Sequence, residues 1–311
     1  MEKSLLKLFS NPPMVMITYE YEQQIHKVCA SLEWYSLTGS IKDRVAYNIL
    51  STAKTQGIID NNTKIVEVSS GNMGLSITAI ANLMGLSTTI IMPKFLSKER
   101  KDLLKLYGAT LVEVDDFKQA FKVCDEYIKN GYFCTNQFEN KDNLLIHKKT
   151  TAKYLHKAIK NHDLKGFIAG VGTSGTLSGV GEYLKEKTDL KLIAIEPKNA
   201  PILSGCNSPK HHQLQGLSDE IVPELYNKNI VDSIIKITDE DALAISQKLA
   251  RELSLGVGIS SGANFLGCVL SKLDSTTIFP DDNKKYLSTN LSTPISTPLV
   301  DKIKLLSLTA L

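Results

Sequence analysis

The sequence predicts an α/β protein in which mostly parallel, twisted sheets are flanked by helices. Short apolar runs typical of strands alternate along the chain with longer runs whose apolar residues recur at helical spacing, which is the pattern of a parallel sheet covered by helices. The 311 residues are 42% hydrophobic and 22% charged. Such a chain can form one large or two ordinary folded domains.

The alternation begins with a predicted helix over residues 41–57. Ile41, Val45, Ile49 and Ala53 recur at helical spacing, and Gly57 ends the run. Predicted strands and helices then alternate in the order KIVEV, MGLSITAIANLMG, TTIIMP, SKERKDLLKLYG and TLVEV.

The second half of the chain repeats the alternation, with a boundary predicted near residues 145–160. A strand, GFIAGV, leads to a helix from Thr176, then to the strands LKLIAIE and IVDSIIKI. The helix DEDALAISQKLARELS follows, with Thr238 as its predicted N-cap. The segment after Thr289 combines Ser, Thr and Pro with an apolar end. Two interpretations of it stay open, a tether or an element that docks on another surface.

Charge and cysteine content narrow the function classes. Net charge is +3 from 36 basic and 33 acidic residues, and no basic stripe is interleaved with aromatic residues, so nucleic acid is not an expected partner. The five cysteines are odd in number and form no C-x-x-C pair, which favours a reducing, cytoplasmic compartment and no metal site. The N-terminal apolar run is too short for a secretory signal, and no segment reaches the length of a membrane span.

A glycine motif raises the possibility of dinucleotide binding. Gly170, Gly172 and Gly175 have the G-x-G-x-x-G spacing that holds a pyrophosphate, and Glu196 ends the next strand, where such a fold places the acid for its ribose. A nicotinamide-dependent dehydrogenase is therefore one hypothesis for this chain.

Two strand-to-helix junctions are candidate anion sites. In SSGNMG, residues 69–74, and in GVGTSGT, residues 171–177, small residues lead a strand directly into a helix. Unpaired N–H groups at the positive end of a helix dipole attract anions. Glycine and serine also serve simply to shape tight turns, so one such junction alone would not decide between the two interpretations.

Lys42 is the candidate catalytic residue. It is predicted in the first turn of its helix, where the dipole disfavours a cation by roughly 0.3–1 kcal/mol at an exposed site. The same position favours the neutral amine, which is the form that condenses with an aldehyde as a Schiff base.

Five ordered motifs together resemble those of the cysteine synthase (O-acetylserine sulfhydrylase) and cystathionine β-synthase family. They are LTGSIKDR, EVSSGNMG, AGVGTSGTLSGVGEYLKEK, VGISSGA and FPDDNKKYLST, and the similarity extends from about residue 11 to Thr289. Members of this family are pyridoxal phosphate enzymes of fold type II. The resemblance implies a larger, cofactor-phosphate-binding domain of residues 1–45 and 148–311, with the placement of 289–311 left open, and a smaller, mobile, substrate-carboxylate domain of residues 46–147. It also implies a homodimer.

The resemblance assigns roles to individual residues. Lys42 would bind pyridoxal 5′-phosphate as a Schiff base and then act as general base, while Asn72 would contact the ring's phenolic oxygen. Ser260 would face the pyridine nitrogen, although its alternative role is a helix N-cap. The substrate-binding residues would be Ser69, Ser70, Met73 and Gln137, with Ser218 and Asp219 near the β-carbon, and the phosphate-binding residues would be Gly172, Thr173, Ser174, Gly175 and Thr176.

Two departures from the family pattern bear on the substrate. Met73 stands where the family has threonine beside the substrate carboxylate, so one hydrogen-bond donor is missing. In QGLSDEIVP, residues 215–223, Ser218, Asp219 and Glu220 replace glycine and alanine in the loop near the β-carbon. If Asp219 points inward, it favours release of sulfide from cysteine, with serine, pyruvate or a thioether-linked amino acid as co-product. The alternative is that both carboxylates face solvent.

Three function classes follow. The leading one is β-replacement or β-elimination on a small amino acid through an aminoacrylate, as in the synthesis of cysteine from O-acetylserine and sulfide. The second is the nicotinamide-dependent dehydrogenase, which would leave Lys42 and SSGN unexplained. The third is a partner protein that binds pyridoxal phosphate but has little activity.

Overall fold

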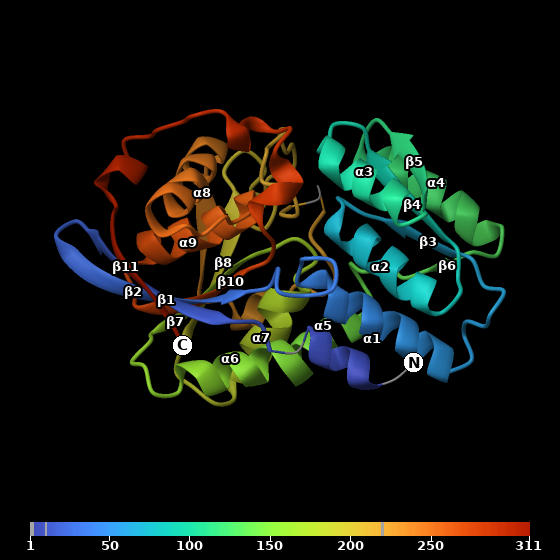
Figure 1. The fold of residues 1–311 in the computed structure, drawn as a ribbon, viewed down its shortest axis with the longest axis horizontal. Helices are drawn as coiled ribbons and strands as arrows, with labels where there is room; N and C mark the ends of the chain where they lie inside the picture. The colour runs from blue at the N-terminus through green and yellow to red at the C-terminus, as the bar shows by residue number, and fades with distance from the viewer. Residues whose placement is uncertain (1–2, 10, 219–220) are drawn as a thin grey trace.

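The computed structural model of the chain contains two sheets built mostly from parallel strands, each flanked by helices (Figure 1). It describes residues 3–9, 11–218 and 221–311. The predicted α/β fold is confirmed.

The larger sheet has seven strands in the order β11-β1-β2-β10-β7-β8-β9. Neighbouring strands from β2 to β9 are parallel, whereas β1 is antiparallel to both β2 and β11. The strands span β1 Met14–Tyr21, β2 Gln24–Leu32, β7 Gly166–Gly170, β8 Lys191–Pro197, β9 Ser233–Ile237, β10 Ser275–Phe279 and β11 Lys304–Ala310.

The smaller sheet has four strands in the order β5-β4-β3-β6, and all of its neighbouring strands are parallel. They span β3 Ile65–Val68, β4 Thr88–Pro93, β5 Thr110–Val114 and β6 Phe133–Cys134. β3 is buried along its whole length because helices cover both faces of this sheet (Figure 1).

The α-helices connect and cover the strands. Their bounds are α1 Lys42–Thr55, α2 Asn72–Leu83, α3 Lys98–Leu106, α4 Phe117–Lys129, α5 Lys141–Ile146, α6 Ala152–Ile159, α7 Gly175–Lys185, α8 Asp239–Leu253 and α9 Ile259–Ser271. A π-helical turn, His147–Thr151, joins α5 to α6. The short 3-10 helices are Lys3–Leu8, Lys228–Ile230, Asn283–Tyr286, Asn290–Ser292 and Val300–Lys302.

The helix signals in the sequence identify these elements well. The predicted helix at residues 41–57 is α1, and Gly57 adopts φ 72° just beyond its end. Thr238 is the N-cap of α8, since its Oγ1 accepts a hydrogen bond from the N–H of Asp241 at 3.1 Å. Such a cap satisfies one of the N–H groups that a helix leaves unpaired at its start.

The hairpin of β1 and β2 is not predicted from the sequence. Its two-residue turn consists of Glu22 and Gln23, which adopt φ 49° and 63°. Turns that need positive φ usually contain glycine or asparagine, so this turn carries no recognisable signal. The hairpin adds two strands to one side of the parallel part of the larger sheet.

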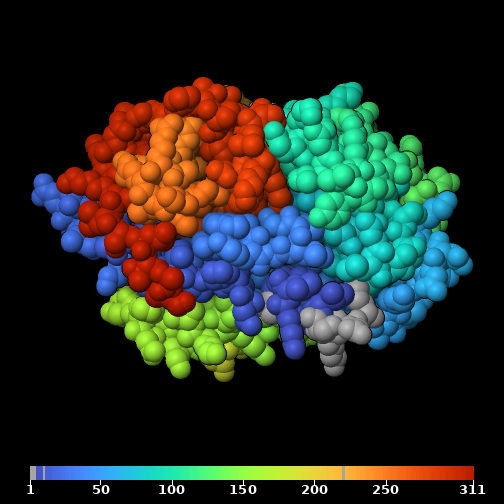
Figure 2. Space-filling view, in the orientation of Figure 1, coloured from blue at the N-terminus to red at the C-terminus, as the bar shows by residue number. Residues whose placement is uncertain are grey.

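The segment after Thr289 docks on the body of the protein. β11 pairs with β1 from Val15↔Ala310 to Glu20↔Lys304, with an irregularity between Thr18 and Tyr19. In the space-filling view these C-terminal residues, in red, lie against the blue N-terminal strands (Figure 2). The docking interpretation is therefore correct, and the tether interpretation is wrong.

The cores lie on both faces of the larger sheet and around the smaller one. One cluster joins β1 and β2 to α8 and α9, and another joins β7 and β8 to α6 and α7. The predicted division of the chain at residues 46 and 147, and the mobility of the smaller part, stay predictions. Within the described residues, no helix combines the length and the apolar character needed to cross a membrane.

We expect removal of residues 304–311 to lower the thermal stability and to promote aggregation, because it would leave the apolar strand β1 as an exposed sheet edge. Thermal unfolding and light scattering measure the two effects. Leu308→Ser is the matched control, since it removes a side chain that is 37% exposed but keeps the backbone pairing. Equal melting temperatures for the truncated and full chains would contradict this role of β11.

Candidate functional site

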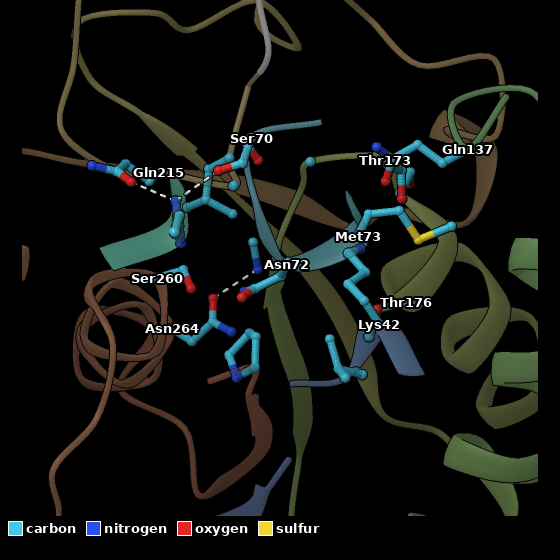
Figure 3. A pocket seen from close by; sticks show the side chains of 18 residues that line it. Lys42, Ser70, Asn72, Met73, Gln137, Thr173, Thr176, Gln215, Ser260 and Asn264 are labelled. Carbon is cyan, nitrogen blue, oxygen red and sulfur yellow. Dashed lines mark hydrogen bonds between the residues drawn. The ribbon is translucent and has the colours of Figure 1, made fainter. Parts of the chain in front are cut away.

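Four helices begin at one cavity. Lys42 and Asn72 are the first residues of α1 and α2, Thr176 and Ser260 are the second residues of α7 and α9, and all four line the cavity (Figure 3). The first N–H groups of a helix have no intrahelical partner and lie at the positive end of its dipole. The cavity therefore favours a ligand with several anionic groups.

Most of the predicted site residues meet in this cavity. Ser69, Gly175 and Ser218 are described by the structure but are not part of the lining, and Asp219 lies outside the described residues. The predicted residues that do line it are Lys42, Ser70, Asn72, Met73, Gln137, Gly172, Thr173, Ser174, Thr176 and Ser260.

The turn between β7 and α7 forms a cradle for an anion. Ser174 adopts φ 65°, which folds the backbone sharply before the helix begins. Thr173 is oriented by Asn143, whose Nδ2 donates to its Oγ1 at 3.0 Å. A Cβ on Gly172 would lie 2.3 Å from the backbone oxygen of Gly216, so only glycine fits the observed backbone here.

A buried histidine lies behind this cradle. The Oγ1 of Thr176 is 3.3 Å from Nε2 of His147, whose Nδ1 is 2.9 Å from the Oγ1 of Thr151. Burial, with further contributions from Arg44 and Lys42, lowers the pKa of His147 well below its ordinary value. The ring is therefore neutral, and the start of α7 supplies the positive potential of the cradle.

The position of Lys42 is set by the turn before α1. The Oγ of Ser40 accepts the N–H of Lys42 at 3.3 Å. The buried carboxylate of Asp43 accepts the N–H of Thr38 at 2.7 Å and the hydroxyl of Ser76, on α2, also at 2.7 Å. Because Asp43 faces away from the cavity into these contacts, the adjacent Lys42 side chain lies in the cavity wall (Figure 3).

The turn between β3 and α2 is a second anion site. Ser69 lies behind the wall, where its Oγ accepts the N–H groups of Gly71 at 3.0 Å and Gly74 at 2.9 Å. Its hydroxyl therefore shapes the turn, and its predicted contact with substrate stays a prediction. Gly71 adopts φ 134°, and a Cβ there would lie 2.4 Å from Cδ of Arg100. This backbone exposes Ser70 to the cavity.

The amide of Asn72 is held from both ends. Its Nδ2 donates to Oδ2 of Asp281 at 2.7 Å, and its Oδ1 accepts from Nζ of Lys285 at 3.0 Å. Burial lowers the pKa of Lys285, and the nearby Asp281 opposes that effect. The amide nitrogen of an asparagine carries a second hydrogen, so Asn72 can also donate to a ligand.

Arg100, on α3, lines the cavity although no sequence signal assigned it a role. Its Nη1 donates to the carbonyl of Ser70 at 3.0 Å and to the side chain of Gln215, and its Nη2 donates to the hydroxyl of Tyr286 at 2.6 Å. The guanidinium also lies 4.6 Å from the centre of the Tyr286 ring and 3.6 Å from Oδ2 of Asp281. A single buried cation thus connects the turn at Ser70 with the loop at Gln215.

Gln137 is fixed next to a buried carboxyl group. Its Nε2 donates to the carbonyl of Val68 at 3.0 Å. On the same strand, Glu67 accepts hydrogen bonds from the N–H of Val68 at 3.0 Å and from the hydroxyl of Thr135. Burial raises the pKa of Glu67 to about 7, although these hydrogen bonds oppose the rise. The protonation of Glu67 is therefore coupled to the loop that carries Gln137.

Ser260 is a lining residue and not a helix cap. The N-cap of α9 is Gly258, and Ser260 lies inside the first turn. The N-cap interpretation of Ser260 is therefore wrong, and its hydroxyl is placed to meet a ligand. Met73 is 2% exposed and lines the cavity, where the related family carries a hydroxyl.

The loop that follows Gln215 carries the substitutions predicted to affect the substrate. Ser218 adopts φ 51°, donates its hydroxyl to the carbonyl of Ala200 at 3.1 Å and its N–H to the carbonyl of Val171 at 2.9 Å. It lines a neighbouring cavity that shares Ser70 and Gln215 with the first. Asp219, like Glu220, lies outside the described residues, so its orientation stays a prediction.

Glu196 does not serve as a ribose-binding acid. Its carboxylate is buried and accepts the N–H groups of Leu203 at 2.8 Å and Ser204 at 3.3 Å. These contacts occupy it with the loop that follows β8. The glycine motif after β7 is therefore without the acid that dinucleotide binding requires.

Comparison with known proteins decides the family. Residues 7–284 match the family described as "Pyridoxal-phosphate dependent enzyme". The chain belongs to this family. A cysteine synthase from Staphylococcus aureus is 36% identical over 299 residues, which cover 93% of this pyridoxal-phosphate dependent enzyme and 96% of the relative. The resemblance to the cysteine synthase family is confirmed.

Solved structures show the same likeness. A hydrogen sulfide-producing enzyme from Fusobacterium nucleatum superposes with a TM-score of 0.94 at 35% identity, covering 99% of this chain and 98% of that one. A cysteine synthase from Entamoeba histolytica superposes with a TM-score of 0.86 at 28% identity, covering 97% and 94%.

The cavity fits pyridoxal phosphate. The cradle after β7 offers hydroxyl groups, a helix N-terminus and, at Gly172, a backbone position where a side chain would clash, which suits a phosphate group. Lys42 supplies an amine in the same cavity, and Asn72 and Ser260 supply polar groups for the substituents of a ring. The donor set thus matches each part of the cofactor.

We expect Gly172→Ala to weaken binding of pyridoxal phosphate at least about tenfold, equivalent to about 1.4 kcal/mol, because its Cβ would displace the Gly216 loop. Titration of the cofactor followed by absorbance measures this. Gly166→Ala, at the other end of β7, is the matched control, since its nearest contact would be an ordinary 3.4 Å to Cδ1 of Leu273. Unchanged affinity in Gly172→Ala would remove the cradle from the phosphate site.

Glu67→Gln should change how stability depends on pH. A folded-state pKa above the unfolded value of 4.5 stabilises the protein fully below that value, and this contribution is lost as pH rises to about 7. The wild type should therefore lose about 2–3 kcal/mol relative to the variant between pH 5 and pH 8. Urea unfolding across this range provides the measurement.

Glu113→Gln is the control for this comparison, since the Lys101 ammonium lowers the pKa of Glu113 and its titration ends below pH 5. Parallel stability curves for wild type and Glu67→Gln would show that Glu67 remains ionised.

Proposed function

We propose that this chain catalyses β-replacement on a small amino acid, in the manner of a cysteine synthase that converts O-acetylserine and sulfide to cysteine. The observation that carries the proposal is one cavity that combines an amine, Lys42, with two separate anion sites, at Ser70 and at Gly172–Thr176. A phosphorylated cofactor and an amino-acid carboxylate need two such sites.

Lys42 acts on the α-proton of the substrate. Bound pyridoxal phosphate supplies an aldehyde that condenses with amines and a ring that withdraws electron density from the α-carbon. Once the substrate amine has replaced Lys42, the freed amine of Lys42 accepts the α-proton as general base and later returns a proton to the same carbon. The position of Lys42 at the start of α1 favours the neutral form that this step requires.

The start of α2 binds the substrate carboxylate. Ser70 faces the cavity, and the first N–H groups of α2 point toward it. Gln137 lines the same wall. Met73 replaces one hydroxyl donor by an apolar side chain, so the carboxylate depends more on backbone N–H groups than in the related family.

Ser260 sets the character of the ring. Its hydroxyl accompanies the pyridine nitrogen in our proposal, and a hydroxyl does not impose a proton on that nitrogen as a carboxylate would. Electron density is then less stabilised on the ring, which favours prompt loss of the β-substituent. Asn72, oriented by Asp281, donates to the phenolic oxygen.

Release of sulfide from cysteine is the second candidate. It uses the same lysine and the same anion sites, and its support is the likeness to the hydrogen sulfide-producing enzyme of Fusobacterium nucleatum. The residue that would favour it, Asp219, lies outside the described residues.

The proposal includes a homodimer in the cytoplasm. All five cysteines are unpaired, as a reducing compartment would leave them. It also includes movement of residues 46–147 toward the rest of the chain when the carboxylate binds. Solution scattering with and without substrate measures both the assembly and the movement.

Purified wild-type protein with pyridoxal phosphate should convert O-acetylserine and sulfide to cysteine, identified by mass, and Lys42→Ala should reduce the rate at least about 100-fold because the general base is lost. Borohydride reduction of the wild type should attach the cofactor to Lys42. Attachment to another lysine would contradict the site assignment, and bound cofactor without turnover of O-acetylserine or cysteine would indicate a binding protein.

A further inference from the structure

A second cavity adjoins the cofactor cavity. The two share Ser70, Gln215 and Gly216, so they meet at the segments that Arg100 connects. A third, wider cavity shares Phe95 and His212 with the second and includes the exposed residues of the surface. The shared residues place the three cavities in a row, which is a route from solvent to the reacting atoms.

His212 is the distinctive residue of the second cavity. Its Nε2 lies 3.2 Å from the carbonyl oxygen of Ser218. A carbonyl oxygen only accepts hydrogen bonds, so Nε2 must carry the hydrogen, and in the neutral ring Nδ1 then has a lone pair. Among the described residues, nothing forms a hydrogen bond with this buried Nδ1. The ring therefore presents an unused proton acceptor.

The surroundings keep His212 neutral. Burial is the main cause that lowers its pKa, the neighbouring His211 lowers it further, and the hydrogen bond to Ser218 opposes both. Lys210, in the same cavity, is a second cationic neighbour, while Asp239 lines only the third cavity. A neutral imidazole with an open lone pair is the state that a general base requires.

Apolar groups complete the second cavity. Phe95 contacts the ring of His211 edge to face at 5.2 Å and Phe117 at 6.4 Å. His211 is exposed, whereas His212 is partly buried. The two adjacent histidines thus differ in environment, and one provides a control for the other.

We propose that Nδ1 of His212 accepts the proton of the sulfur nucleophile, hydrogen sulfide or a small thiol, as that second substrate passes from the surface toward the cofactor cavity. This inference rests on the proposed β-replacement. The nucleophile then enters as an anion, and the helix N-termini that line the cofactor cavity attract it.

The proton balance is complete without a further reagent. The S–H bond breaks, its proton moves to Nδ1 of His212, and the sulfur electron pair forms the bond to the β-carbon of the bound amino acid. The leaving group has departed with its own bonding pair as a carboxylate. Lys42 returns a proton to the α-carbon, and the His212 imidazolium releases the sulfur's proton to solvent.

The test compares a nucleophile that must lose a proton with one that has none to lose. Azide is fully ionised at neutral pH, so its addition needs no base. In holoenzyme already reacted with O-acetylserine, His212→Gln should slow the step with sulfide at least about tenfold and leave the step with azide unchanged. The glutamine amide can still donate to the Ser218 carbonyl, and His211→Gln should alter neither rate.

Equal slowing with sulfide and azide would reduce His212 to a positioning residue and overturn the proposal, as would unchanged rates with both. If His212→Gln fails to bind cofactor, His212→Ala replaces it. Added imidazole should then restore the sulfide step, and absence of such rescue would count against the proposal. A wild type that never responds to O-acetylserine would instead overturn the proposed function.

The tautomer can be examined without turnover. Nitrogen-15 spectra of histidine-labelled protein should show His212 neutral at pH 7, with its proton on Nε2, and Nδ1 should gain a proton only below pH 6.5. A proton on Nδ1 at pH 7 would remove the acceptor on which the proposal depends.

Discussion

The buried carboxylate of Asp281 holds the two walls of the cavity together. It follows β10 of the larger sheet and accepts hydrogen bonds from Asn72, which begins α2, and from Tyr286, both at 2.7 Å. The guanidinium of Arg100, on α3, compensates its charge. An uncompensated buried charge costs several kcal/mol. The cavity therefore exists only while helices of the smaller sheet and the loop after β10 remain in contact.

This arrangement links binding to the position of the two sheets. Arg100 contacts both the carbonyl of Ser70, at the proposed carboxylate site, and the side chain of Gln215, at the passage to the second cavity. A displacement of the turn at Ser70 is thus transmitted to Gln215 through one rigid, planar group. Substrate binding and access for the second substrate share a single hydrogen-bonding centre.

Local patterns in the sequence predicted most strands and helices, and the motif around each helix start placed Lys42, Asn72 and the Gly172–Thr176 cradle correctly in one cavity. Arg100 could not be assigned in this way, because a charged residue in SKERKDLLKLYG looks like part of a solvated face. Its spacing of four from Leu104, on the buried face of α3, is a signal that could have found it. Asp281 and His212 depend on long-range contacts, which no local pattern reveals.

The strand order of the larger sheet has a consequence for synthesis on the ribosome. β1 and β2 emerge early, but their neighbours β11 and β10 are made only after most of the chain, at residues 304–310 and 275–279. The four strands of the smaller sheet lie together between residues 65 and 134. The smaller sheet can thus be completed first, while the nascent hairpin waits with both edges unpaired, a state in which chaperones protect strands from aggregation.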